Sequence, residues 1–149
     1  MALHARRELK YRGRIPLPGC WNLVGVADPG QYLQPGEVYA CVHEPGKDPV
    51  YLDGPIAISR SPTMHPGDIQ LVRAVGKIPD DALARFSTVE NAVVFSSQGP
   101  RSLPSCLAGG DLDGDLYLLI TSPSLFPTRW EAPASYEPSS MKSLNRDAT

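Results

Sequence analysis

Short apolar stretches alternate with Pro/Gly turns between Ile15 and Thr121. The stretches are rich in Val, Ile and Tyr, which favour strands, and Pro-Gly pairs stand between several of them. The pattern predicts six strands, at Asn22–Val26, Glu37–His43, Ile56–Ser59, Ile69–Val75, Ala92–Ser96 and Leu116–Thr121. Strands this short and this many favour an all-β fold, a small closed barrel rather than an open sheet, because closure leaves no edge exposed.

Only Pro79–Phe86 has the pattern of a helix. Asp80 or Asp81 can cap its first turn, and Leu83 and Phe86 lie three positions apart. The chain holds 13 Gly and 16 Pro, well above ordinary usage. We therefore expect few long helices.

The two ends differ from the region between them. Residues 1–14 form a basic lead-in with a single acid, Glu8, which is either a solvated arm or a segment that touches phosphate. Residues 122–149 hold four prolines and several serines without a sustained period, which predicts an irregular tail. Leu125, Phe126 and Trp130 are able to pack against the barrel, which we expect to span residues 15–121.

Composition limits the class of protein. Hydrophobic residues make up 42% of the 149 residues, enough for one buried core. A net charge of −2 excludes a uniformly basic nucleic-acid coat protein. The chain contains no run of about 18 apolar residues, the length needed to span a membrane, and its N-terminus lacks the apolar region of a signal peptide.

The cysteines indicate the redox environment. There are three of them, Cys20, Cys41 and Cys106, an odd number, and they are too far apart for a CxxC zinc site. We therefore expect a reducing intracellular location, the nucleus or the cytoplasm.

The most informative motif is DLDGD, directly before the apolar strand LYLLI. Asp111, Asp113 and Asp115 are spaced i, i+2 and i+4, which places their side chains on one face of an extended segment. Gly114 allows the backbone to curl, so the three carboxylates can converge. They would repel one another, and no Lys or Arg lies within the segment. A divalent cation relieves that repulsion, and hard oxygen ligands favour Mg²⁺, Mn²⁺ or Ca²⁺ over zinc.

Two other interpretations of the motif are structural. A solvated acidic turn is one, because Asp-Gly pairs are common in hairpins. An EF-hand calcium loop is the other, but it needs Gly at its sixth position and Glu at its twelfth. Counted from Asp111, those positions hold Leu116 and Ser122, so the EF-hand interpretation fails. From the residues alone, a metal site and a solvated turn both remain open.

Two further segments hold candidate substrate-binding groups. In Ser59–Asp68, two prolines predict a rigid turn, where Arg60 is either a forked donor to a sugar or phosphate or an ordinary strand-end arginine. His65 of this turn is expected to stabilise it by a hydrogen bond. Arg101 stands ten residues before Asp111 and either neutralises substrate phosphate or pairs with one of the acids.

Three segments in this order, SRSPTMHPGDIQ, AVVFSSQGPRSLPS and LAGGDLDGDLYLLI, resemble the cellular RNA-dependent RNA polymerases of eukaryotic RNA silencing. The sequences of these segments are most similar to those of fungal members. The upstream segment WNLVGVADPGQYLQPGEVYACV is similar to the strand pair that precedes the family's catalytic barrel. The resemblance covers residues 14–121, most of the chain.

The resemblance implies a double-psi β-barrel, the fold shared with the largest subunit of multisubunit RNA polymerases. It makes Asp111, Asp113 and Asp115 the catalytic ligands of Mg²⁺, with Mn²⁺ as a substitute. Arg60 falls at the arginine that approaches the sugar of the incoming nucleotide, and Arg101 falls at a family arginine of less defined role. Gln98 and Ala108 depart from the family, which often has Lys and Ser at these positions.

By this resemblance we expect magnesium-dependent transfer of nucleotides from nucleoside triphosphates to the 3′-hydroxyl of RNA, in RNA silencing. RNA template and product, nucleoside triphosphates and a second barrel with the remaining polymerase domains are the expected partners. The family's second barrel supplies a catalytic lysine and does not fit in this length. We therefore expect a fragment or a truncated paralogue, without processive synthesis of its own. The alternatives are a non-catalytic barrel that binds metal or RNA, and an unrelated β-barrel with an acidic calcium turn.

Overall fold

A computed structural model describes residues 10, 15, 17–79 and 89–136. This part of the chain contains seven strands and three short 3₁₀ helices. The strands are β1 (Cys20–Ala27), β2 (Glu37–Val42), β3 (Val50–Tyr51), β4 (Asp53–Arg60), β5 (Ile69–Val75), β6 (Ala92–Phe95) and β7 (Leu116–Ile120). The 3₁₀ helices are η1 (Pro66–Asp68), η2 (Pro104–Cys106) and η3 (Pro123–Leu125).

All six predicted strands are present, and two differences have a physical reason. The strand β3 is only two residues long, too short to leave a pattern in the sequence. The strand β4 begins at Asp53, three residues before the predicted start at Ile56, because Pro55 does not interrupt it. Pro55 is paired only on its β5 side, since β7 joins β4 from Ala57 onward, and proline is tolerated where one side of a strand is open. Apart from its first residue, the helix expected at 79–86 lies outside the described residues.

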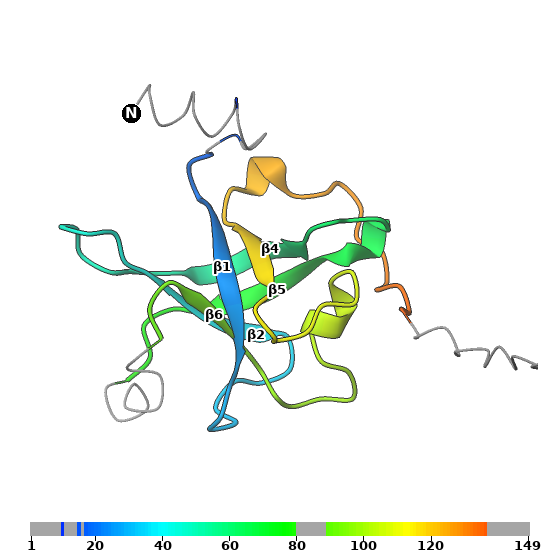
Figure 1. Ribbon diagram of the computed structural model, residues 1–149, viewed down its shortest axis with the longest axis horizontal. Helices are drawn as coiled ribbons and strands as arrows, with labels where there is room; N and C mark the ends of the chain where they lie inside the picture. The colour runs from blue at the N-terminus through cyan, green and yellow to red at the C-terminus, as the bar shows by residue number, and fades with distance from the viewer. Residues whose placement is uncertain (1–9, 11–14, 16, 80–88, 137–149) are drawn as a thin grey trace, which may run out of the picture.

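Six of the strands close into a barrel of mixed direction. The order β2–β5–β4–β7–β1–β6 returns to β2 through the additional β2–β6 pairing, and the short β3 pairs with the last two residues of β2, Cys41 and Val42. The pairs β1–β6 and β2–β5 are parallel, and the other pairs are antiparallel. In Figure 1, β7 (yellow) lies between β1 and β4. The expected all-β fold, a small barrel of the double-psi type, is confirmed.

The core consists of two groups of apolar side chains. The larger one fills the barrel and contains Leu23, Val38, Ala40, Val42, Leu52, Ile56, Ile58, Val72, Ala74, Val93, Phe95, Leu107, Tyr117 and Leu119. The smaller one contains Leu33, Tyr39, Cys41, Ile78 and Val94. Alternate residues of β2 and β6 belong to the two groups, so these strands are buried on both faces.

The register between β4 and β7 brings distant parts of the chain together. Arg60, the last residue of β4, pairs with Tyr117, the second residue of β7. The DLDGD motif ends directly before β7. Because the two strands are antiparallel, the C-terminal end of β4 lies beside the acidic motif.

The boundaries that we predicted between the lead-in, the barrel and the tail stay a prediction. In the region after the barrel, the rings of Phe126 and Trp130 are in edge-to-face contact, with centroids 6.1 Å apart.

Candidate functional site

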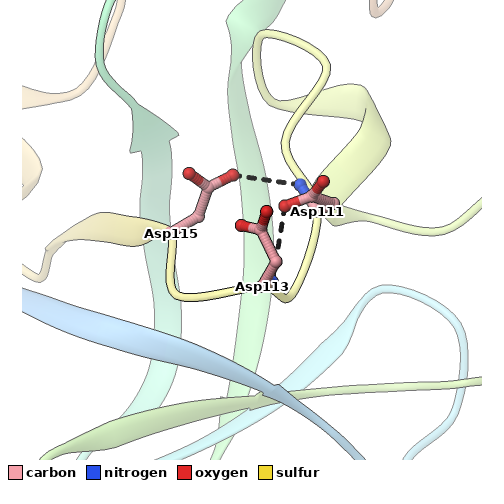
Figure 2. Close-up of side chains that lie close together, drawn as sticks. All are labelled: Asp111, Asp113 and Asp115. Carbon is pink, nitrogen blue, oxygen red and sulfur yellow. Dashed lines mark hydrogen bonds between the residues drawn. The ribbon is translucent and has the colours of Figure 1, made fainter.

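The three aspartates converge as their spacing predicts. One carboxylate oxygen each of Asp111, Asp113 and Asp115 lies within 4.8 Å of the others (Figure 2). Two hydrogen bonds within the motif hold this arrangement: the Asp111 N–H donates to Asp115 Oδ2 (3.0 Å), and the Asp113 N–H donates to Asp111 Oδ1 (3.4 Å). Gly114 has a φ of +122°, a conformation that side chains rarely adopt, and allows the curl.

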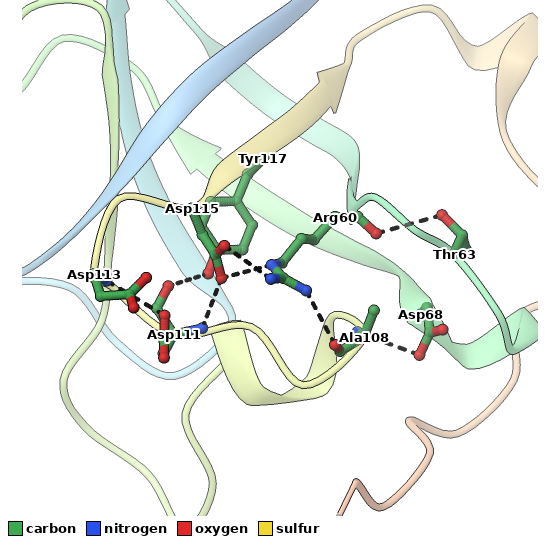
Figure 3. A network of polar contacts seen from close by, with 8 residues as sticks. All are labelled: Arg60, Thr63, Asp68, Ala108, Asp111, Asp113, Asp115 and Tyr117. Carbon is green, nitrogen blue, oxygen red and sulfur yellow. Dashed lines mark hydrogen bonds and ion pairs between the residues drawn. The ribbon is translucent and has the colours of Figure 1, made fainter.

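Arg60 reaches this group from β4. Its Nη2 donates to Asp115 Oδ1 (2.8 Å), and its Nη1 donates to the Ala108 carbonyl (3.2 Å) (Figure 3). Its Nε lies 2.5 Å from Asp115 Oδ2, but the N–H is not directed at that oxygen, so this contact is an ion pair without a hydrogen bond. A base therefore does compensate one of the three carboxylates, although it lies 55 residues away in the sequence.

The acids of the site differ in their electrostatic surroundings. The hydrogen bond from Arg60 lowers the pKa of Asp115. The pKa of Asp113 moves the other way, because its hydrogen bond with Asp111 and the charge of that residue raise it. Asp111 and Asp113 are exposed and Asp115 is half-buried, so the site is open to solvent. Among the ion pairs of the described residues, Arg60 is in direct contact with Asp115 and none joins a base to Asp111 or Asp113. Three hard oxygen donors of this kind fit a divalent cation of the Mg²⁺, Mn²⁺ or Ca²⁺ type.

Tyr117 holds the first aspartate from inside the barrel. Its hydroxyl donates to the Asp111 carbonyl (2.6 Å), and its fully buried ring packs edge-on against Phe95, with centroids 4.7 Å apart. Burial raises the pKa of Tyr117 well above its usual range. The hydroxyl therefore stays protonated and remains a donor.

Two glycines make room for the residues of the site. A Cβ at Gly25 would lie 2.4 Å from Tyr117 Cε2. A Cβ at Gly110 would lie 2.7 Å from both the Tyr117 hydroxyl and Arg60 Cδ. Any larger residue at Gly110 would displace the two side chains that hold Asp111 and Asp115. The sequence predicts a role for Gly114 alone, as the residue that lets the backbone curl. The close packing around Gly25 and Gly110 depends on distant residues and leaves no signal in a single sequence.

The structure does not bring Arg101 to the aspartates. Within the described chain its Nη2 donates to the carbonyls of Ser105 (2.8 Å) and Ala134 (2.6 Å), and its Nε donates to Ser105 Oγ (3.2 Å). Arg101 therefore ties its own loop to the segment after the barrel. A role for it in substrate binding stays a prediction.

The other residues singled out in the sequence stabilise loops. His65 Nδ1 accepts a hydrogen bond from the Gly67 N–H (2.9 Å), which confirms the expected turn-stabilising role. Gln98 donates its amide hydrogens to the carbonyls of Gln31 (2.8 Å) and Leu33 (3.1 Å). The polar end of Gln98 therefore joins the loop after β6 to the loop after β1.

Two residues near the site were missed in the sequence. Asp68 is buried and bound to the loop that leads into DLDGD, and Tyr136 covers it from the segment after η3. Asp68 looked like one acid of a turn. Tyr136 stands in a Pro/Ser-rich stretch with no period, so nothing marked it.

None of the helices in the described part of the chain has the length and apolar character needed to cross a bilayer.

Comparison with known proteins places the chain in a family. The family model "RNA dependent RNA polymerase" matches residues 1–149. Over 144 residues the chain is 35% identical to "Probable RNA-dependent RNA polymerase 1" of Oryza sativa subsp. japonica, covering 95% of this chain and 19% of that protein. Over 145 residues it is 30% identical to "RNA-dependent RNA polymerase 1" of Arabidopsis thaliana, covering 95% of this chain and 12% of that protein.

A solved structure shows the same fold. The RNA dependent RNA polymerase QDE-1 from Thielavia terrestris superimposes with a TM-score of 0.69 at 24% identity, covering 93% of this chain and 15% of that one. The chain thus spans less than a fifth of the length of these proteins. Because the family model covers every residue, the chain belongs to the RNA-dependent RNA polymerase family.

Proposed function

We propose that this chain is the magnesium-binding catalytic barrel of an RNA-dependent RNA polymerase that acts inside the cell in RNA silencing. The reaction is nucleotidyl transfer, in which the 3′-hydroxyl of RNA attacks the α-phosphate of a nucleoside triphosphate and pyrophosphate leaves. The observation that carries the proposal is the convergence of Asp111, Asp113 and Asp115 within 4.8 Å, with Arg60 bound to only one of them. The names of the relatives support the reaction class.

The residues of the chain divide the work as follows. Asp111, Asp113 and Asp115 hold Mg²⁺, or Mn²⁺ in its place, and the bound ion supplies charge stabilisation to the attacking and leaving oxygens. Arg60 orients Asp115. Its Nη1 and Nη2 each use one N–H, for Ala108 and Asp115 respectively, and its Nε–H is buried, so the remaining N–H groups of Nη1 and Nη2 would be the donors for the sugar of the nucleotide. Arg101 keeps the loop before the motif in place.

The expected partners follow from how small a part of its relatives' length the chain spans. It spans 19% of the rice relative and 12% of the Arabidopsis relative. We propose that a second barrel and other polymerase domains complete the site, with RNA template and product and nucleoside triphosphates as substrates. The protein would contact the sugar-phosphate backbone of the RNA, while the sequence is read by base pairing between template and incoming nucleotide.

Binding of Mn²⁺ to the purified chain, followed by electron paramagnetic resonance, tests the proposal. The titration is run with and without a nucleoside triphosphate and is competed with Mg²⁺ and Ca²⁺. Asp113→Ala should abolish binding, whereas Asp48→Ala, at an exposed acid after β2, is the matched control and should bind as the wild type does. We expect Mg²⁺ to displace Mn²⁺ and nucleotide to strengthen its binding.

Two results would count against the proposal in different ways. A preference for Ca²⁺, or equal binding by Asp113→Ala, would show that the carboxylates are not the expected Mg²⁺ site. Binding of Mn²⁺ that nucleotide leaves unchanged would favour a non-catalytic barrel of the same family.

A further inference from the structure

Asp68 is a fully buried acid with more hydrogen bonds than its turn requires. Its relative exposure is 0%. Asp68 Oδ2 accepts from the N–H groups of Met64 (3.0 Å) and His65 (2.9 Å), which shapes the local turn. The Ala108 N–H (3.3 Å) and the Tyr136 hydroxyl (2.7 Å) add bonds to Oδ1 from 40 and 68 residues away, and the hydroxyl also lies 2.6 Å from Oδ2.

These donors explain how a carboxylate is kept in the protein interior. Burial by itself raises the pKa of Asp68, but the hydrogen bonds from Tyr136 and from the backbone outweigh it, and the pKa lies below its ordinary value. Burying an ionised carboxylate is costly unless such donors surround it. A turn between β4 and β5 could be capped by the two local bonds alone. The two distant bonds therefore point to a role outside the turn.

Ala108 connects Asp68 to the aspartate site. Its N–H donates to Asp68 Oδ1, and its carbonyl accepts from Arg60 Nη1 (3.2 Å) (Figure 3). Its φ is +51°, a left-handed conformation that costs a residue with a Cβ about 1 kcal/mol. Both ends of one strained residue are thus fixed, one by Asp68 and the other by the arginine that binds Asp115.

Residues 131–136 form a strap that places Tyr136. Gln70 Nε2 donates to the Glu131 carbonyl (3.2 Å), and Arg101 Nη2 donates to the Ala134 carbonyl (2.6 Å). The strap also passes close to Gly67, where a Cβ would lie 2.0 Å from the Ala132 carbonyl oxygen. The strap is therefore fitted to the turn and to the loop before the motif.

We propose that Asp68, completed by Tyr136, is a positioning residue for the three-aspartate site. Asp68 fixes the Ala108 peptide, and the Ala108 carbonyl fixes the Arg60 guanidinium in its contact with Asp115. The strap thereby contributes to metal binding without touching the metal. This inference rests on the proposed function of the aspartates as metal ligands.

Two measurements on the whole 149-residue chain test it. The first is the NMR signal of the Arg60 guanidinium without metal, assigned by its loss in Arg60→Met; restrained rotation gives separate Nη signals. The second is Mn²⁺ affinity by electron paramagnetic resonance. Tyr136→Phe removes only the hydroxyl, Asp68→Asn is the second variant, and Tyr51→Phe on β3 is the control.

We expect Tyr136→Phe to merge the separate Nη signals of Arg60 and to weaken Mn²⁺ binding about tenfold, the lower end of what outer partners of metal ligands contribute. Excess Mn²⁺ should restore full occupancy. In an Arg60→Met background Tyr136→Phe should change Mn²⁺ affinity no further, because the path runs through that arginine. A merely stabilising hydroxyl would lower the melting temperature and leave the guanidinium signals and the Mn²⁺ affinity unchanged.

The outcomes separate this inference from the proposed function. If the wild type binds Mn²⁺ and both variants bind it equally with unchanged Arg60 signals, the inference is overturned and the metal site stands. If the wild type binds no Mn²⁺, the proposed function fails, and the Arg60 signals alone decide whether Asp68 and Tyr136 hold the guanidinium.

Discussion

Replacement of Tyr117 by Phe removes the hydroxyl that donates to the Asp111 carbonyl and keeps the ring. The edge-on contact with Phe95, at 4.7 Å between centroids, and the close approach to Gly25 both involve the ring and are retained. The variant therefore isolates one hydrogen bond of 2.6 Å between the barrel interior and the acidic motif.

The structure allows the size of the effect to be worked out. A buried hydrogen bond contributes a net 0.5–1.5 kcal/mol, roughly, to the free energy of unfolding. Asp111 is exposed, so water can replace the lost donor, and we expect a loss of about 1 kcal/mol. For a chain of this length that lowers the melting temperature by about 3 °C. If the same hydrogen bond also preorganises the motif, Mn²⁺ affinity falls about fivefold, because 1.4 kcal/mol corresponds to about a factor of ten.

Thermal unfolding without metal and Mn²⁺ titration by electron paramagnetic resonance measure the two effects. Tyr51→Phe, on β3, is the matched control: its stability can change, but its Mn²⁺ affinity should equal that of the wild type. If Tyr117→Phe lowers the melting temperature and binds Mn²⁺ as tightly as the wild type, the hydroxyl serves the fold alone and our reasoning about the motif is wrong.

Three further predictions concern other parts of the molecule. Gly110→Ala should lower the free energy of unfolding by about 1–3 kcal/mol in urea titrations, because its Cβ would overlap the Tyr117 hydroxyl; an unchanged midpoint would contradict the packing. Asp28→Ala removes two hydrogen bonds to backbone N–H groups, of 2.9 and 2.8 Å, and should cost about 2 kcal/mol in the same assay, whereas a loss below about 0.5 kcal/mol would refute it. The hydrogen bond to Glu90 raises the pKa of His43, so Glu90→Gln should lower that pKa in an NMR titration. A raised histidine pKa stabilises the fold at low pH, so the stability difference between wild type and variant should vanish as the pH rises through it.

Six of the seven strands in the described part of the chain were predictable because each is an apolar, Val/Ile/Tyr-rich stretch between turns, whereas the two-residue β3 was not. The carboxylate group was predictable for a similar reason: spacing of i, i+2 and i+4 depends only on local backbone geometry, and the curl at Gly114 is local as well. Even the pairing of His65 with the backbone of its own turn follows from neighbours two residues away.

What could not be predicted depends on contacts between distant residues. The meeting of Arg60 with Asp115 follows from the β4–β7 register, and no local pattern specifies which strands pair. The glycine at position 110 is needed only because Tyr117 and Arg60 arrive beside it. Tyr136 donates its hydroxyl to Asp68 from a strap that has no periodic pattern, so neither its position nor its partner could be recognised in the sequence.

The place of β7 in the barrel has a consequence for the synthesis of the protein. This strand is the last of the barrel in the sequence and lies between β1 and β4, which precede it by many residues. Chains emerge from the ribosome N-terminus first, so β1 and β4 each present an unpaired edge until Leu116–Ile120 has been released. Such edges pair readily with other chains. We therefore expect the nascent protein to be open to such pairing until its three aspartates and β7 have appeared, because the barrel closes only when β7 is in place.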